Sequence, residues 1–132
     1  MNVKSFTLSS LAAALCMVLV AGLWHEVIMP GLYATKGHAA HEGRGIIFLA
    51  FIILAGFMSY LYPRLYVQGG TVIDGLKFGM LMGLLWVFPH ELAMVGAHGE
   101  SIGYVFKNAA WHMVEQGVGG MVIALAYKKF QE

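Results

Sequence analysis

The sequence has 132 residues, of which 59% are hydrophobic and 11% are charged, and its formal net charge is +1. Soluble domains carry about 25% charged residues, so this composition excludes an ordinary soluble fold and indicates one small integral membrane domain over residues 1–132. The small net charge also excludes the basic surface with which proteins bind nucleic acid, so the expected surroundings are the lipid bilayer.

Four segments of the sequence are long and apolar enough to cross a bilayer, which takes about 20 residues in a helix. They cover approximately residues 6–29, 41–62, 72–95 and 105–127. Proline, glycine or paired lysines follow them, at Pro30-Gly31, Pro63, Gly96 and Lys128-Lys129. Because the connections are short, sequential helices should be antiparallel neighbours. We therefore predict an all-α fold, an antiparallel four-helix transmembrane bundle.

The basic residues predict the orientation of this bundle, because lysine and arginine are enriched on the cytoplasmic side. Five of them belong to one end of the predicted helices: Lys4, Arg64, Lys77, Lys128 and Lys129. Three belong to the other end: Lys36, Arg44 and Lys107. This bias predicts that both termini are cytoplasmic.

A short motif recurs and predicts that the bundle is built from two tandem helical hairpins. His25-Glu26 followed by Gly31 recurs as His90-Glu91 followed by Gly96. Each half contains two spans, so both halves would have the same orientation in the membrane, related by an axis along the membrane normal.

Histidine and glutamate collect at one end of the predicted helices, on the outer side of the membrane. The first and third spans close with His25-Glu26 and His90-Glu91, and the second and fourth open with His41-Glu42 and with His112 and Glu115. Ionisable groups at membrane depth are costly and usually functional. His38 and His98 lie beside glycines in loops and are the least expected to take part.

We interpret this layer as a metal site, because imidazole and carboxylate are common ligands of transition metals. The expected ligands are Glu26, Glu42, Glu91, Glu115, His112, His25, His41 and His90. Glutamate on four helices with a nearby histidine is also the ligand set of di-iron and di-manganese bundles, although the order His-x-x-Glu on the fourth helix is reversed. The sequence therefore favours iron or manganese and an oxidoreductase, with zinc or copper as other metals that such ligands bind.

Three other functions fit the same pattern. A b-type haem would use His25 and His90 as its two axial ligands. A metal-ion or proton transport protein would use the acids and histidines as a relay, although the inner halves of the second and fourth spans are almost wholly apolar. An accessory subunit of a larger membrane complex would have no chemistry of its own.

Three glycines form a stripe of small residues on one face of the third span, at Gly75, Gly79 and Gly83. Such a stripe allows helices to approach closely. It serves either the core of the bundle or a homodimer contact, and the sequence does not distinguish the two.

Overall fold

The computed structural model describes residues 2–33, 43–66 and 70–131, and all of its regular structure is helical. The helices, in chain order, are α1 (Val3–Leu23), a π-helical turn η1 (Trp24–Ile28), α2 (Pro30–Tyr33), α3 (Arg44–Leu65), α4 (Val72–His98) and α5 (Ile102–Gln131). The predicted all-α class is thereby confirmed.

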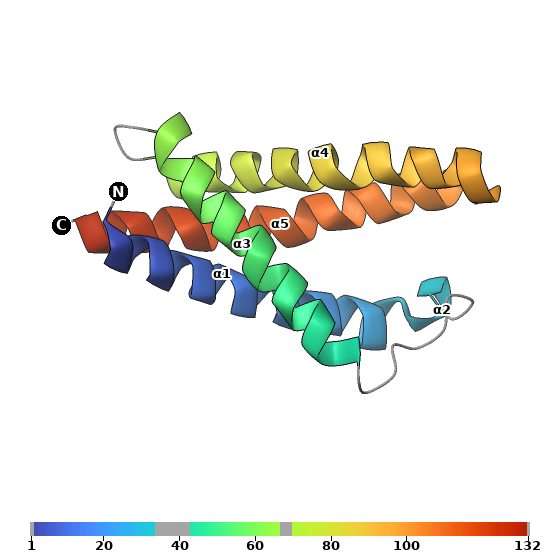
Figure 1. The fold of residues 1–132 in the computed structure, drawn as a ribbon, viewed down its shortest axis with the longest axis horizontal. Coiled ribbons are helices and arrows are strands. Elements are labelled where there is room, and N and C mark those ends of the chain that lie inside the picture. The colour runs from blue at the N-terminus through green and yellow to red at the C-terminus, as the bar shows by residue number, and fades with distance from the viewer. Residues whose placement is uncertain (1, 34–42, 67–69, 132) are drawn as a thin grey trace.

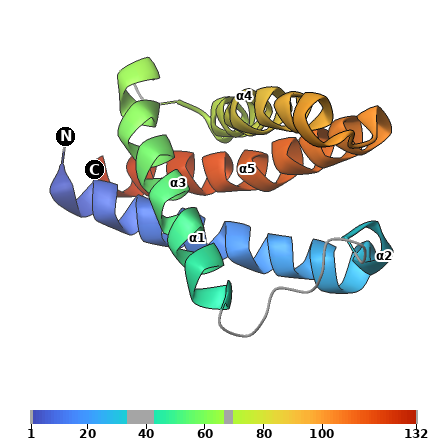
Figure 2. The same ribbon diagram turned by 45° about the vertical axis from the view of Figure 1, so that its right-hand side comes forward.

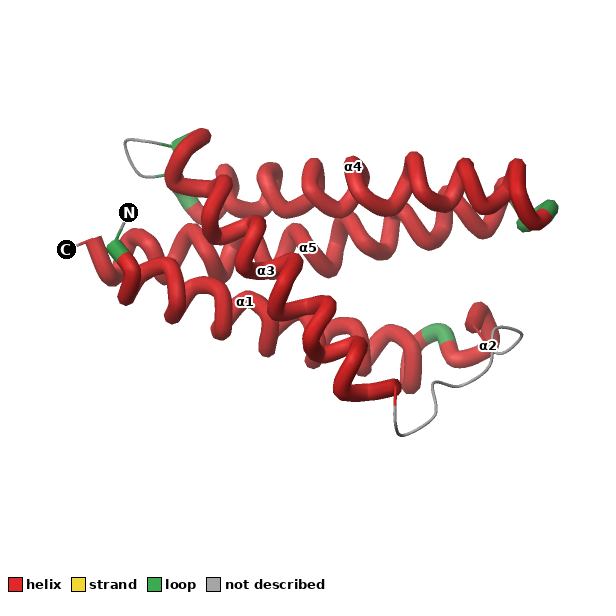
Figure 3. The backbone as a smooth tube through the Cα atoms, viewed as in Figure 1, coloured by secondary structure: helices red, strands yellow, loops and turns green. Residues whose placement is uncertain are grey.

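Helix α5 is the central element of the fold. It packs along α4 on one side and along α1 on the other, and α3 crosses over them at an angle (Figures 1 and 2). The start of α1 and the end of α5 lie at the same end of the molecule, called here the terminal end (Figure 3). Helix α3 is not aligned in parallel with its neighbours. The regular bundle of two equivalent hairpins therefore stays a prediction.

The glycine stripe of α4 forms the closest contact between helices. A Cβ atom on Gly75 or Gly79 would overlap the backbone oxygen of Gly120 or Gln116, and one on Gly83 would overlap that of His112. The backbones of α4 and α5 can therefore approach this closely only because these α4 residues have no side chain. Of the two roles expected for the stripe, the structure shows the contact within the chain.

Helix α3 continues through Pro63, so the prediction that this proline ends the second span is wrong. Proline has no N–H to donate to the carbonyl four residues earlier, which here belongs to Ser59. The Tyr127 hydroxyl of α5 donates a hydrogen bond to that carbonyl oxygen at 2.8 Å. A side chain from another helix thus satisfies the carbonyl group that the proline leaves without a partner.

The other helices also extend beyond the predicted limits. Helix α4 begins at a capping box in which Thr71 and Asp74 bond each other's backbone N–H, and it ends at Gly99, whose φ of 69° is left-handed. Gly96 is therefore inside the helix and not at its end. Helix α1 is prolonged by η1, in which the N–H of Met29 donates to the Trp24 oxygen at 2.8 Å.

The buried core lies toward the terminal end of the fold. It combines small side chains and methionines of α1 and α3 with Tyr62, Phe78, Ile123 and Tyr127. Within the described part of the chain, three helical stretches are long and apolar enough to cross a membrane: Val3–Ile28, Arg44–Leu65 and Val72–His98. Helix α5, which covers the predicted fourth span, has more polar residues and is not among them.

The glycine contact predicts a specific stability defect. Gly79→Ala places a methyl group against the backbone of α5, so the gain in helix propensity is outweighed by overpacking, which costs about 1–3 kcal/mol. Thermal unfolding in detergent, followed by circular dichroism, should show a lower free energy of unfolding. The control is Gly56→Ala on α3, where a Cβ meets nothing within 4 Å and the variant should be unchanged or more stable. Equal free energies of unfolding for Gly79→Ala and Gly56→Ala would contradict the close contact between α4 and α5 at Gly79.

Candidate functional site

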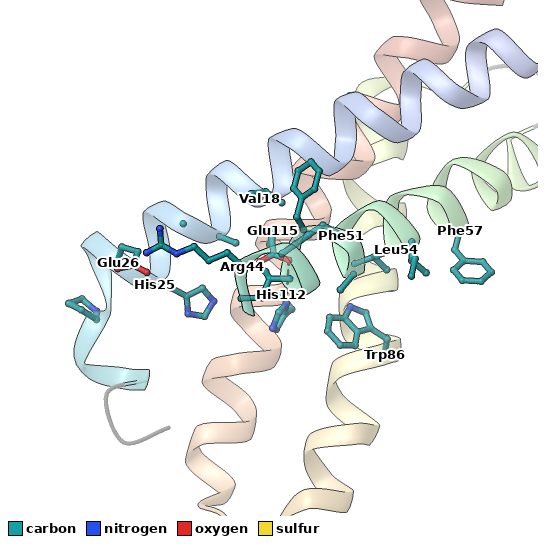
Figure 4. A pocket seen from close by; sticks show the side chains of 17 residues that line it. Val18, His25, Glu26, Arg44, Phe51, Leu54, Phe57, Trp86, His112 and Glu115 are labelled. Carbon is teal, nitrogen blue, oxygen red and sulfur yellow. Dashed lines mark ion pairs between the residues drawn. The ribbon is translucent and has the colours of Figure 1, made fainter. Parts of the chain in front are cut away.

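A cavity of about 1130 Å³ lies between α1, η1, α3 and α5, and Pro30 of α2 and Trp86 of α4 complete its lining (Figure 4). Most of its wall is apolar. The apolar lining consists of Val18, Ala21, Gly22, Pro30, Ile47, Phe48, Ala50, Phe51, Ile53, Leu54 and Phe57. Much of the α3 wall is itself exposed, with Phe48 at 44% and Phe57 at 62%. The cavity is therefore open along α3 and is not sealed inside the fold.

The polar part of the lining consists of His25, Glu26, Arg44, Trp86, His112 and Glu115. Sequence reasoning placed four of these residues in one layer, and the structure brings these four, His25, Glu26, His112 and Glu115, to one cavity. Helix α3 contributes Arg44 near its first turn, and this side chain extends toward η1 in the view of Figure 4.

The π-helical turn η1 positions the two polar residues of the first helix. π-Turns are rare and occur often at functional sites, because they change the direction of side chains relative to a regular helix. Here the turn contains both His25 and Glu26, and both line the cavity. Behind it, Trp24 stacks on Trp111 of α5, with ring centroids 4.2 Å apart and an interplanar angle of 5°. This stacking holds η1 against α5.

The deepest polar group of the cavity is the carboxylate of Glu115, which is fully buried. Its Oε1 atom accepts a hydrogen bond from Gln116 Nε2 at 2.6 Å and lies 3.4 Å from His112 Nδ1 (Figure 4). Its Oε2 atom is buried and has no hydrogen-bond partner among the residues that the structure describes. A buried carboxylate oxygen without a partner is costly, so the cavity presents an acceptor that is ready for a donor.

A hydrogen-bonded chain fixes the orientation of this carboxylate. Trp86 Nε1 of α4 donates to Gln116 Oε1 at 3.3 Å, so the amide nitrogen of Gln116 faces Glu115. The Trp86 ring also packs edge-on against the His112 ring, with centroids 5.1 Å apart. Side chains of α4 and α5 thus support each other around the acceptor.

Two other predicted site residues lie outside the cavity. Glu91 Oε1 accepts a hydrogen bond from Asn108 Nδ2 at 3.1 Å, which makes a separate polar contact between α4 and α5. His90 is exposed on α4 and does not line the cavity, so the two proposed haem ligands His25 and His90 do not share it. His41 and Glu42, like His38, lie outside the described residues.

The predicted metal centre does not form among the residues that the structure describes. In residues 2–33, 43–66 and 70–131, no three His, Cys, Asp or Glu side chains come close enough to hold a metal ion. Iron, manganese, zinc, copper and haem therefore stay predictions.

Sequence reasoning missed four residues of this polar network: Arg44, Trp86, Asn108 and Gln116. For α5 a signal was present, because Asn108, His112, Glu115 and Gln116 have the spacing of one helical face in an otherwise apolar segment. For Trp86 there was none, because a tryptophan in an apolar helix is ordinarily a packing residue.

Comparison with protein-family models, with curated proteins and with solved structures finds no match to this chain.

The hydrogen-bonded chain predicts that Gln116 stabilises the fold. Gln116→Met keeps the volume but leaves Glu115 Oε1 and Trp86 Nε1 without the partner that each has now. The free energy of unfolding should fall by about 1–2 kcal/mol, measured by thermal denaturation in detergent. Val114→Met, two residues away at an exposed position, is the control and should change it by less than about 0.5 kcal/mol. If Gln116→Met and the control have the same free energy of unfolding, the hydrogen-bonded chain of Trp86, Gln116 and Glu115 does not stabilise the fold.

Proposed function

We propose that this chain is an integral membrane protein of four spans that binds an amphipathic small molecule in its cavity. The apolar body of the ligand lies along α3 and its polar head reaches Glu115. One observation carries this proposal: a large apolar cavity ends at a buried carboxylate oxygen that has no partner among the described residues.

The distribution of exposed side chains supports the membrane part of the proposal. Large apolar residues cover the outer faces of α1, α3 and α4, among them Leu19, Phe57 and Leu85, each more than half exposed. Water would make such surfaces unfavourable, whereas lipid chains match them. Helix α5 lies between α1 and α4 (Figure 1), and its residues Asn108, Glu115 and Gln116 are buried, so they are shielded from lipid.

The shape and chemistry of the cavity support the binding part. Ligand sites are mostly apolar, have volumes of about 300–1,000 Å³ and contain a few polar groups that set orientation. This cavity is slightly larger and has its polar groups at one end. Its open side along α3 would face lipid, so a ligand dissolved in the membrane would enter without crossing water.

The other functions considered from sequence receive less support. A metal-dependent oxidoreductase and a haem protein need ligands that the described residues do not bring together. Neither transport nor an accessory role requires a large apolar cavity with a buried carboxylate, so this cavity gives no specific support to either function.

The proposed orientation predicts a labelling pattern. The test uses two variants, Ser101→Cys and Leu65→Cys, each in a Cys16→Ala background. Ser101 lies between α4 and α5, Leu65 lies at the end of α3, and both positions are exposed. A membrane-impermeant thiol reagent should label Ser101→Cys in intact cells, because that end is outside. It should label Leu65→Cys only after permeabilisation, because that end is cytoplasmic. The reverse pattern would invert the orientation, and the same result for both positions in intact cells would contradict their placement on opposite sides of a membrane.

Binding in the cavity predicts saturable quenching of tryptophan fluorescence. A brominated long-chain alcohol, added to protein in lipid nanodiscs, should quench Trp86 with a saturating dose response, since bromine quenches on contact and Trp86 lines the cavity. Ala50→Phe fills the cavity and should weaken this binding at least about tenfold. Its neighbour Leu49 is exposed and outside the lining, so Leu49→Phe should behave as wild type. Linear, unsaturated quenching in all three proteins would mean that the alcohol only partitions into lipid.

A further inference from the structure

The free oxygen of Glu115 specifies what kind of head group the cavity accepts. Oε1 is engaged by the Gln116 amide and lies 3.4 Å from His112 Nδ1, whereas Oε2, like His112 Nδ1, is buried without a hydrogen-bond partner among the described residues. A carboxylate oxygen accepts hydrogen bonds, so a head that donates through O–H or N–H is favoured. A head with only acceptor atoms would leave the oxygen unsatisfied and would add a repulsive contact.

The charges around the cavity favour a neutral head. Glu115 has His112 beside it, and Arg44 supplies a positive charge on the same lining as Glu26. An anionic head would be repelled by the two carboxylates in a region where charges are poorly screened, and a cationic head would be attracted by them but repelled by Arg44. A neutral donor is subject to neither repulsion.

Aromatic side chains surround the path between the apolar body of the cavity and its polar end. Trp86 lies over His112 from the α4 side, and Phe48 and Phe51 line the opposite wall on α3. Aromatic rings pack favourably on one another in stacked or edge-on arrangements. A planar ring in the head group would pack against these aromatic side chains, whereas a simple alkyl alcohol would make fewer such contacts.

We infer that the cavity takes a lipid-soluble aromatic alcohol, a hydroquinone or a phenol with an apolar tail, whose hydroxyl donates to Glu115 Oε2. The inference concerns binding alone and rests on the proposed function. Hydrogen bonds to a charged acceptor discriminate strongly. A decyl benzoquinol should therefore bind about 10- to 100-fold more tightly than the matching benzoquinone, which has the same ring and tail but no donor.

The test uses competition in nanodiscs under anaerobic conditions. The brominated alcohol is bound first, and native mass spectrometry follows its displacement by the benzoquinol, the benzoquinone, the dimethyl ether of the quinol and decyl-trimethylammonium. The quinol should displace at the lowest concentration, and the quinone and the ether, which both lack the O–H group, should be similarly weak. Equal displacement by quinol and ether, or better displacement by the quinone or the ammonium compound, would overturn the inference.

Two matched variants locate the interaction. Glu115→Gln keeps the shape of the side chain but replaces the charged acceptor, so the preference for quinol over quinone should fall to less than about threefold. Glu91→Gln alters a carboxylate outside the cavity lining and should keep the full preference. A preference that survives in Glu115→Gln would assign the head to another group. The ether comparison stays decisive if Glu115→Gln fails to fold.

Failure of this inference is distinguishable from failure of the proposed function. If the brominated alcohol never saturates the wild-type protein, the cavity binds no such molecule and both fall. If it saturates but the head groups compete equally, the cavity binds amphipathic molecules without selecting a donor, and only the inference falls.

Discussion

The close backbone contact between α4 and α5 determines how the polar side chains between these two helices meet. Its glycines pair in register, so that each turn of α4 meets a defined turn of α5, from Gly75 opposite Gly120 to Gly83 opposite His112. Packed helices of this kind cannot slide by a fraction of a turn without a clash. The register places Trp86 within reach of Gln116 and Glu91 within reach of Asn108.

The same contact explains why the most polar helix is the central one. A glutamate, a glutamine and an asparagine facing lipid would each be unfavourable, and the cost falls only when they meet partners inside the fold. Helix α4 supplies such partners through Trp86 and Glu91, and α1 covers the remaining side with Met17 against Gly119 and Trp24 on Trp111. Among the described residues, Glu115 Oε2 and His112 Nδ1 are buried atoms outside this pairing, and both belong to residues that line the cavity.

The sequence predicted the helices better than it predicted how they cross. Length and hydropathy located all four long helices, and the glycine spacing located the face on which α4 packs. Pro63 could not be interpreted correctly, because the group that satisfies the Ser59 carbonyl is Tyr127, far away in the sequence. The π-turn at Trp24–Ile28 could not be predicted from the sequence either, since its extra residue per turn is not marked by a characteristic amino-acid composition. The tilt of α3, which opens the cavity, depends on the sum of many such contacts.

The predicted metal layer shows what sequence periodicity leaves undetermined. Depth along the helices was sufficient to group histidines and glutamates in one layer, but convergence also requires each side chain to point the same way around its helix. Adjacent residues such as His90 and Glu91 differ by about 100° in direction, and the structure separates them: Glu91 turns to Asn108 while His90 is exposed. Among the described residues, the i, i+3 pair His112 and Glu115, which must share a face, stays together. The adjacent pair His25 and Glu26 joins them in the cavity lining through the π-turn η1. The proposed binding site therefore depends on Glu115, the buried carboxylate whose position on α5 is determined by helix geometry and by the glycine register.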